Sequence, residues 1–232
     1  MKNGTIITID NLIKRFPIGG GEFTALNGIN LTFEKGEFSG IVGPSGSGKT
    51  TMLNIMGSLD SPTVGQTNVL GTTSEKITPR LAATLRKKHI GFIFQTYNLM
   101  PVYTVYENVE FPLLLLRMPA LERKKAVLDA IEWVGLTDKI KSKPPQLSGG
   151  ESQRVAIARA MVKKPDLVLA DEPTANLDAE NSHHILQTME KLNKDLETTF
   201  VFATHDDKVI GYLRRIIKLE DGKVVSDENI TK

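Results

Sequence analysis

Hydrophobic residues follow two kinds of pattern along this chain. Near the N-terminus they alternate with polar residues, at 5–10 and 26–33, which predicts half-buried strands in an antiparallel arrangement. Pro17 and the glycines at 19–21 mark a loop between these strands. Later segments are continuous apolar runs, which are typical of strands covered on both faces. These runs occupy 38–42, 90–94, 167–170 and 199–203.

Helical patterns separate the buried strands. Apolar residues recur at helical spacing between 121 and 134, with charged residues between them, and Gly135 suits the end of that helix. A second helix is expected over about 179–196, and Asp221-Gly222 favours a C-terminal hairpin. Because apolar strands alternate with helices, we expect an α/β fold with a parallel core sheet and right-handed crossovers.

A glycine-rich segment at 43–51 joins one buried strand to a helical run. It matches G-x-x-x-x-G-K-[ST], which in this context is a phosphate-binding loop. Glycines let backbone N–H groups converge on one anion, and the following helix adds its positive end. Lys49 is suited to neutralising phosphate charge and Thr50 to ligating Mg²⁺. The expected nucleotide contacts are Gly43, Ser45, Gly46, Ser47, Gly48, Lys49, Thr50 and Thr51.

Polar residues follow three other buried strands at the points where they end. They are Gln95, the pair Asp171 and Glu172, and His205. Ligands of parallel sheets lie at the carboxyl ends of strands, so these groups and the loop are expected to form one site. Asp171 has the position of a Mg²⁺-holding acid, and Glu172 that of a general base. Taken singly, His205 or Gln95 would indicate no more than a loop.

Composition limits the other classes of function. The chain has 232 residues, of which 40% are apolar, and a net charge of +2, so nothing indicates an extended nucleic-acid-binding face. Since there is no cysteine, disulfides and thiolate metal sites are excluded. No apolar segment approaches the ~18 residues that span a bilayer, and the N-terminus carries no signal-peptide block. We therefore expect a soluble protein, which leaves a membrane partner possible.

Two short motifs are expected to be incidental. Asn193-Lys194-Asp195 resembles the guanine-binding motif of GTPases, but its aspartate is one place early. This stretch lies on a charged helix and is predicted to be a solvated face. His183 and His184 are adjacent on the same helix, so their side chains should point apart and not form a metal pair.

The segment 147–154, Leu-Ser-Gly-Gly-Glu-Ser-Gln-Arg, has the local pattern of a helix start. Ser148 and Glu151 fit a capping box at a helix start. Gly149 and Gly150 leave the first N–H groups of that helix open to an anion. The segment resembles the signature sequence of ATP-binding-cassette (ABC) ATPases. Other family motifs are matched on either side of it, in family order: Gln95 matches the Q-loop, residues 171–174 the strand-end acids, 175–178 the D-loop, and His205 the switch histidine.

The resemblance implies a phosphate-loop NTPase core with an antiparallel β subdomain, over 1–95 and 165–232, and an inserted helical subdomain over 96–164. It implies a head-to-tail dimer in which ATP lies between Lys49 of one chain and the segment 148–151 of the other. The resemblance assigns roles that the spacing alone does not. Glu172, His205 and Gln95 would be catalytic, Thr50, Gln95 and Asp171 would hold Mg²⁺, and Phe16, Ser148, Gly149, Gly150, Glu151 and Asp178 would contact nucleotide.

Three positions depart from the family pattern. Phe16 stands where a tyrosine usually stacks on adenine, and it could instead be a core residue of the hairpin. Glu151 replaces a more common glutamine, and Ala175 a common glycine. None of these changes removes a catalytic group, so we expect an active ATPase.

The stretches 91–101 and 107–113 resemble the ABC branch that serves lipoprotein release, macrolide and peptide export, and cell division. That branch implies an integral membrane partner and a location on the cytoplasmic face of the bacterial inner membrane. The apolar residues beyond Gln95 suit either a docking surface for that partner or the core of the helical subdomain. They are Tyr97, Leu99, Met100, Val102 and Tyr103.

Two functions remain open from the sequence. One is an ATPase that powers export or extraction of a lipoprotein, peptide or drug. The other is a regulatory ATPase that signals through its membrane partner to a periplasmic cell-wall hydrolase. A soluble ABC protein acting on DNA or ribosomes is disfavoured, because the chain has no long coiled-coil insertion, tandem cassette or strong basic patch.

Overall fold

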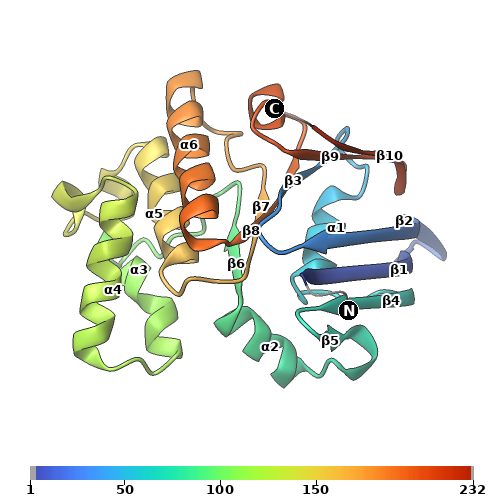
Figure 1. Ribbon diagram of the computed structural model, residues 1–232, viewed down its shortest axis with the longest axis horizontal. Helices are drawn as coiled ribbons and strands as arrows, with labels where there is room; N and C mark the ends of the chain where they lie inside the picture. The colour runs from blue at the N-terminus through green and yellow to red at the C-terminus, as the bar shows by residue number, and fades with distance from the viewer. Residues whose placement is uncertain (1–3, 231–232) are drawn as a thin grey trace.

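The computed structural model describes residues 4–230 and contains two sheets (Figure 1). The first is antiparallel with strand order β2-β1-β4-β5. The second has the order β10-β9-β3-β8-β7-β6, and it is parallel except for the hairpin of β9 and β10. The α/β prediction with an antiparallel N-terminal sheet is therefore confirmed. The strands are β1 (Thr5–Ile18), β2 (Gly21–Glu34), β3 (Phe38–Val42), β4 (Val64–Val69), β5 (Thr72–Thr73), β6 (Ile90–Ile93), β7 (Leu167–Asp171), β8 (Thr199–Thr204), β9 (Arg215–Glu220) and β10 (Lys223–Asn229).

The helices lie on both sides of the central sheet. They are α1 (Lys49–Met56), α2 (Pro79–Lys88), α3 (Val105–Leu115), α4 (Ala120–Trp133), α5 (Gly149–Met161), α6 (Ala179–Leu196) and α7 (Asp207–Ile210). Short 3₁₀ turns lie between these elements at Ser74–Lys76, Thr137–Lys139 and Pro144–Gln146. In Figure 1, α3, α4 and α5 gather at the left and the antiparallel sheet lies at the right. Over residues 4–230, none of the helices combines the length and apolarity needed to cross a bilayer.

The alternation of side chains along the central strands creates two hydrophobic cores. In β8, Phe200 and Phe202 face a cluster built with α3, α4, α5 and α6. Val201 and Ala203, the alternate residues, face a second cluster built with α1 and the antiparallel sheet. Phe38 of β3 packs edge-on against Phe202, with ring centroids 4.8 Å apart. Both faces of the sheet are thus covered, which explains the continuous apolar runs.

The loop predicted at Pro17 is wrong, because β1 continues through it to Ile18. Pro17 lies opposite Glu22 of β2, whereas pairing between β1 and β4 reaches only to Ile13. The end of β1 is therefore an edge with one neighbour, where a missing N–H group costs little. The turn is confined to Gly19 and Gly20, both at positive φ.

The apolar face of α4 is narrower than the sequence predicted. Val127 and Ile131 are fully buried, whereas Leu121 is 84% exposed and Leu128 is 37% exposed. The helix ends as expected, with Gly135 at φ +66° just beyond it.

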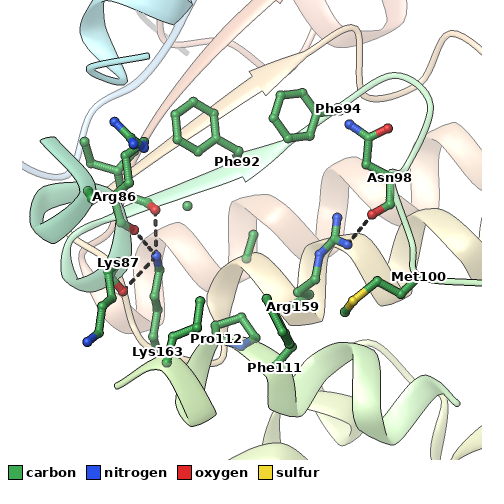
Figure 2. A pocket seen from close by; sticks show the side chains of 15 residues that line it. Arg86, Lys87, Phe92, Phe94, Asn98, Met100, Phe111, Pro112, Arg159 and Lys163 are labelled. Carbon is green, nitrogen blue, oxygen red and sulfur yellow. Dashed lines mark hydrogen bonds between the residues drawn. The ribbon is translucent and has the colours of Figure 1, made fainter. Parts of the chain in front are cut away.

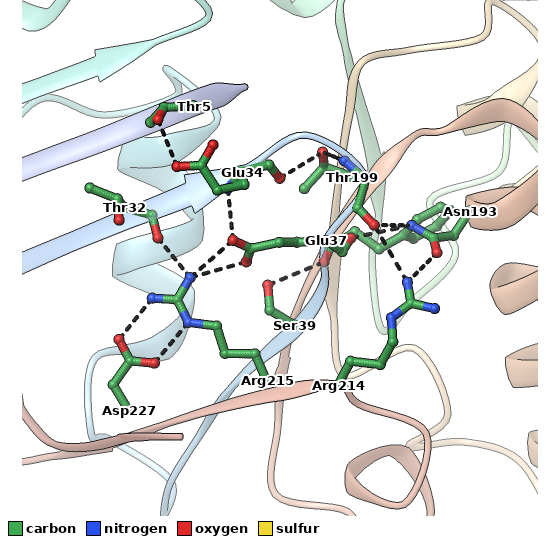
Figure 3. A network of polar contacts seen from close by, with 12 residues as sticks. Thr5, Thr32, Glu34, Glu37, Ser39, Asn193, Thr199, Arg214, Arg215 and Asp227 are labelled. Carbon is green, nitrogen blue, oxygen red and sulfur yellow. Dashed lines mark hydrogen bonds and ion pairs between the residues drawn. The ribbon is translucent and has the colours of Figure 1, made fainter. Parts of the chain in front are cut away.

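A polar network joins the C-terminal hairpin to the rest of the fold (Figure 3). Arg215 of β9 forms two hydrogen bonds of 2.7 Å to the Asp227 carboxylate on β10. The same guanidinium lies 3.1 Å from a Glu37 carboxylate oxygen and donates to the carbonyl of Thr32 at 2.7 Å. One cation thus connects β2, β9, β10 and the segment before β3.

Asn193 is the second centre of this network, which makes the predicted solvated face wrong at this residue. It is 3% exposed, and its amide donates to the carbonyls of Gly36 at 3.1 Å and Thr198 at 2.7 Å. Its oxygen accepts a hydrogen bond from Arg214. The asparagine satisfies loop carbonyls that a charged helix surface would leave unpaired.

We predict that Arg215→Met lowers the free energy of unfolding by about 3 kcal/mol, because it leaves the Glu37 carboxylate without its cation. Urea unfolding followed by circular dichroism measures this loss. Lys194→Met is the control, because Lys194 forms an exposed pair with Glu190 one helical turn away, and its loss should cost less than about 0.5 kcal/mol. Equal losses in the two variants would contradict the structural role of Arg215.

Candidate functional site

The loop at 43–51 connects the end of β3 to the start of α1, and its glycines are required by the space around them. A Cβ on Gly43 would lie 2.0 Å from the carbonyl oxygen of Leu219. Gly46 and Gly48 have φ values of +83° and +105°, and a Cβ on Gly48 would lie 2.6 Å from the Ala25 carbonyl. Side chains would therefore displace the backbone that forms the anion cradle.

A cavity of about 490 Å³ opens beside this loop, which is within the usual ~300–1,000 Å³ of small-molecule sites. Because β3, β8, β7 and β6 are neighbours, their carboxyl ends meet at one edge of the sheet. The structure brings together in this cavity most of the residues expected there from the sequence. They are Phe16, Ser45, Gly46, Gly48, Lys49, Thr50, Thr51, Gln95, Asp171, Glu172 and His205.

Lys49 is the cation of the cavity. Its side chain is largely buried, and its ammonium donates hydrogen bonds to the carbonyls of Gly43 at 2.7 Å and Pro44 at 3.0 Å. Ser47 lies in the loop behind it, and its buried hydroxyl oxygen has no hydrogen-bond partner within residues 4–230. An unsatisfied buried hydroxyl in a backbone cradle fits a phosphate ligand.

Thr50 and Asp171 meet across the cavity, with the threonine hydroxyl donating to a carboxylate oxygen at 2.9 Å. Burial raises the pKa of Asp171, the hydrogen bond from Thr50 lowers it, and the neighbouring Glu172 carboxylate raises it. A hydroxyl and a carboxylate are hard oxygen ligands of the kind that Mg²⁺ prefers. Among residues 4–230, no group of three or more His, Cys, Asp or Glu side chains is arranged to hold a metal ion.

Glu172 is held in an unusual conformation at the end of β7. Its φ is +45°, a strained value for a residue with a side chain. One carboxylate oxygen lies 2.6 Å from Nδ1 of His205, and the other accepts a hydrogen bond from the Thr204 hydroxyl at 3.1 Å. Glu172 and His205 therefore form a hydrogen-bonded pair that lines the cavity, and Thr204 orients the Glu172 carboxylate. No sequence pattern indicates the role of Thr204, which directly follows an apolar run.

The aromatic end of the cavity has two rings instead of the one expected. Phe16 and Phe23 are cross-strand partners in the β1–β2 hairpin, and both line the cavity together with Ala25. Phe16 is 37% exposed and carries the Lys14 ammonium 4.9 Å from its ring centroid. It is therefore not a core residue of the hairpin, and its ring is available for stacking. The symmetric placement of Phe16 and Phe23 about the glycine turn could have revealed the second ring.

The signature segment lies outside this cavity. Ser148 and Glu151 form the predicted capping box at the start of α5, with the serine hydroxyl accepting from the Glu151 N–H at 3.2 Å and the carboxylate accepting from the Ser148 N–H at 2.7 Å. That backbone bond is the main reason why the pKa of Glu151 is lowered, and Lys139 at 3.2 Å adds to it. Gly149 is exposed at the helix N-terminus.

Asp178 also lies apart from the cavity. It caps α6, where its carboxylate accepts from the N–H of Asn181 at 2.8 Å and from the Asn181 side-chain amide at 2.7 Å. The backbone bond is the largest cause of its lowered pKa. The site in one chain thus holds the loop and the strand-end acids, while the segment 148–151 and Asp178 form a separate polar surface.

Both the sequence and the fold of this chain are similar to those of known proteins. A sequence profile of the ABC transporter family matches residues 26–175. The chain is 43% identical to the lipoprotein-releasing system ATP-binding protein LolD of Pseudoalteromonas translucida over 98% of each chain. It is 40% identical to the macrolide export ATP-binding/permease protein MacB of Hyphomonas neptunium over 96% of this chain and 34% of MacB. The dimeric structure of the ATP-binding cassette MJ0796 of Methanocaldococcus jannaschii bound to ADP and Pi superposes with a TM-score of 0.90 at 40% identity, covering 98% of this chain and 100% of that one.

The opposite pKa shifts of Asp171 and Asp178 predict opposite effects of neutral substitution. A raised folded-state pKa means that ionised Asp171 opposes folding at neutral pH, so Asp171→Asn should raise the free energy of unfolding at pH 7. A lowered folded-state pKa means that ionised Asp178 favours folding, so Asp178→Asn should lower it.

Thermal unfolding of both variants across a pH series measures these effects. The Asp171→Asn difference should shrink as the pH falls through the raised folded-state pKa and vanish below the ordinary pKa of an aspartate, and the Asp178→Asn difference should vanish below the lowered folded-state pKa, because the aspartate is then neutral in both the folded and the unfolded state. Shifts of the same sign at pH 7 would show that burial and capping do not set these two pKa values.

Proposed function

This chain belongs to the ABC transporter family, and we propose that it powers a membrane transporter of the kind that releases lipoproteins or exports macrolides. Its activity is that of an ABC ATPase, the ATP-binding subunit of a transporter. The observation that carries the proposal is the single cavity in which the phosphate loop, Asp171, Glu172, Gln95 and His205 meet. Two relatives that match over nearly the whole of both chains are named for lipoprotein release, which favours export over signalling to a cell-wall hydrolase.

The cavity suggests how ATP is held. The adenine would stack on Phe16, with Phe23 beside it, and the phosphates would accept hydrogen bonds from the loop N–H groups and the Lys49 ammonium. Thr50 and Asp171 would hold Mg²⁺, which when bound supplies positive charge to the phosphate oxygens. Gln95, on the facing wall of the cavity, would orient the attacking water.

Glu172 is placed to act as the general base. Its carboxylate would take a proton from the water that attacks the γ-phosphorus, while the bond to the β-phosphate oxygen breaks. The bonds from Thr204 and His205 hold this carboxylate in one orientation, so its rotamer is fixed before the water arrives. His205 is 61% exposed at its side chain and is proposed to donate a hydrogen bond to the γ-phosphate.

One chain carries two half-sites. Gly149 is exposed at the capped N-terminus of α5, where the first N–H groups of a helix can bind an anion, and this helix end lies outside the chain's own ATP cavity. A two-fold dimer in which each α5 faces the other chain's phosphate loop would complete both sites at once. Asp178 would then contribute to the facing site from the start of α6. The dimeric relative MJ0796 supports this assembly.

A groove of about 520 Å³ on another face suits the membrane subunit (Figure 2). One wall has the stacked rings of Phe92 and Phe94, whose centroids are 5.6 Å apart. The other wall carries Phe111, Pro112 and Leu115 of α3. Phe94, which lines the groove, directly precedes Gln95 in the chain. A cytoplasmic helix of the partner seated in the groove would therefore contact the loop that carries Gln95. This arrangement would place the chain on the cytoplasmic face of the membrane.

The apolar residues after Gln95 fall into two groups, which fit the two roles that the sequence left open, a docking surface and the core of the helical subdomain. Met100 lines the groove, and Val102 and Tyr103 are 70% and 38% exposed. Leu99 packs against the helical core.

Glu172→Gln should bind ATP yet hydrolyse it about 10²–10⁴-fold more slowly, because the amide cannot accept the proton of water. It should accumulate an ATP-bound dimer, measured by light scattering during gel filtration with ATP and Mg²⁺. Adding Ser148→Arg to this variant should abolish the dimer while a single chain still binds ATP. Retention of the dimer in the double variant would exclude the head-to-tail assembly, and near-normal turnover of Glu172→Gln would exclude Glu172 as the base.

Leu115→Asp should prevent association with the membrane subunit, because it places a charge on the apolar wall of the groove. The measurement is mass spectrometry of membrane proteins that co-purify with the affinity-tagged chain from detergent-solubilised host membranes. Leu121→Asp is the control, since Leu121 is more exposed but lies outside the groove. If both variants retain the same membrane protein as wild type, the groove is not the docking site.

A further inference from the structure

A partly buried arginine joins the signature helix to the loop that carries Gln95. Arg159 lies near the end of α5, and its guanidinium donates to the carbonyl of Asn98 at 2.5 Å and to that of Tyr97 at 2.6 Å. Figure 2 shows the side chain pointing from the helix toward Asn98. Among residues 4–230, no carboxylate lies within ion-pair distance of Arg159. Its polar contacts in this region are therefore with the loop.

The loop is held in a strained conformation at the two residues that Arg159 contacts. Tyr97 and Asn98 have φ values of +60° and +48°, in the left-handed region that costs residues with side chains about 1–2 kcal/mol each. Consecutive left-handed residues turn their carbonyls to one side, where the guanidinium binds both. Bonds from a charged donor are strong enough to offset this strain.

The same loop contacts the other end of α5. The hydroxyl of Tyr97 lies 3.2 Å from the position of a Cβ built on Gly149, the first glycine of the signature segment. The loop is also tied at its start, because the side-chain amide of Asn176 donates to the carbonyl of Gln95 at 3.0 Å. Tyr97 therefore connects the two ends of α5, because its hydroxyl lies near the first turn and its carbonyl binds the Arg159 side chain near the last.

From these contacts we infer that Arg159 is a positioning residue that makes the Gln95 loop and the signature end of α5 move as one body, and so couples the two ATP sites of the dimer. This inference rests on the proposed head-to-tail function. In that assembly, Gln95 serves the ATP bound by its own chain, and Gly149 and Gly150 serve the ATP bound by the partner. A rigid connection between them transmits the state of one site to the other.

Lys163 provides a matched control for a purely structural role. Like Arg159 it is a partly buried cation at the wall of the groove, and burial lowers its pKa to about 8. It donates to the carbonyls of Lys87 at 3.2 Å and Ile90 at 2.7 Å, and also to that of Arg86. These carbonyls lie at the end of α2 and the start of β6, so its loss removes similar bonds without freeing the Gln95 loop.

The first experiment compares the ATP dependence of hydrolysis in Arg159→Met, Lys163→Met and wild type. Wild type should show a Hill coefficient approaching about 2, the number of sites. The Hill coefficient of Arg159→Met should fall to about 1, while a single chain of this variant keeps its affinity for ATP. Arg159→Lys should recover part of the cooperativity. Lys163→Met should lose stability yet keep the wild-type coefficient. If Arg159→Met stays as cooperative as wild type, or Lys163→Met loses as much cooperativity, the inference is wrong.

A second experiment does not depend on ATP hydrolysis. Because the sequence has no cysteine, Thr96→Cys on the loop and Glu132→Cys on α4 allow two spin labels, and electron–electron resonance measures the distance between them. The wild-type background should give one narrow distribution with and without ATP, and Arg159→Met a broad one. Arg159→Gln, which loses the charge but keeps a polar group, is measured if Arg159→Met does not fold, and an unbroadened distribution in the charge-free variant measured overturns the inference. If wild type fails to hydrolyse ATP while Arg159→Met still broadens the distribution, the proposed function fails and the mechanical link stands.

Discussion

The neighbouring order of β3, β8, β7 and β6 in the central sheet is the constraint on which the ATP site depends. Each of these strands ends in a different chemical group, and parallel pairing delivers all four ends to one edge. The phosphate loop supplies N–H donors and a cation, β7 supplies two carboxylates, and the segments after β6 and β8 supply Gln95 and His205. Removing the parallel register would separate these groups even if every local motif formed correctly.

The same constraint is a physical reason for the dimer that we propose. The edge of the sheet arranges donors on one side of a bound phosphate, and the opposite side is left to the capped start of α5, which points away from its own cavity. Helix N-termini bind anions only at close range, so the segment 148–151 can serve only a phosphate brought to it by another molecule. The separation of two phosphate-binding surfaces within one fold is therefore the physical basis for assembling the dimer around nucleotide.

Much of this arrangement could be predicted from the sequence, because the relevant signals are local. Glycines in a strand-to-helix turn, apolar runs that end in acids, and the Ser148–Glu151 spacing each reflect nearby backbone geometry. The contacts that position these groups could not be predicted in the same way. Asn193 belongs to a charged helix pattern, yet long-range pairing with Gly36 buries it. Thr204 likewise acquires its place from a tertiary contact with Glu172, which a local pattern does not encode.

The groove and the ATP cavity are connected through the chain segment from Phe94 to Asn98, which would have an energetic consequence. Arg159 lines the groove and also binds the loop that carries Gln95, while Phe94 of the groove directly precedes that glutamine. A partner seated between Phe92 and Phe111 would contact the residues that fix the loop, so its binding free energy would depend on the loop's position. Linkage is reciprocal, so nucleotide that shifts the loop must change affinity for the partner by the same factor. A strained loop held by a cation is suited to linking the binding of nucleotide to the binding of the partner. The position of the loop depends on the balance between its backbone strain and the two hydrogen bonds from Arg159, so a small change at the groove or at the ATP cavity would alter that position.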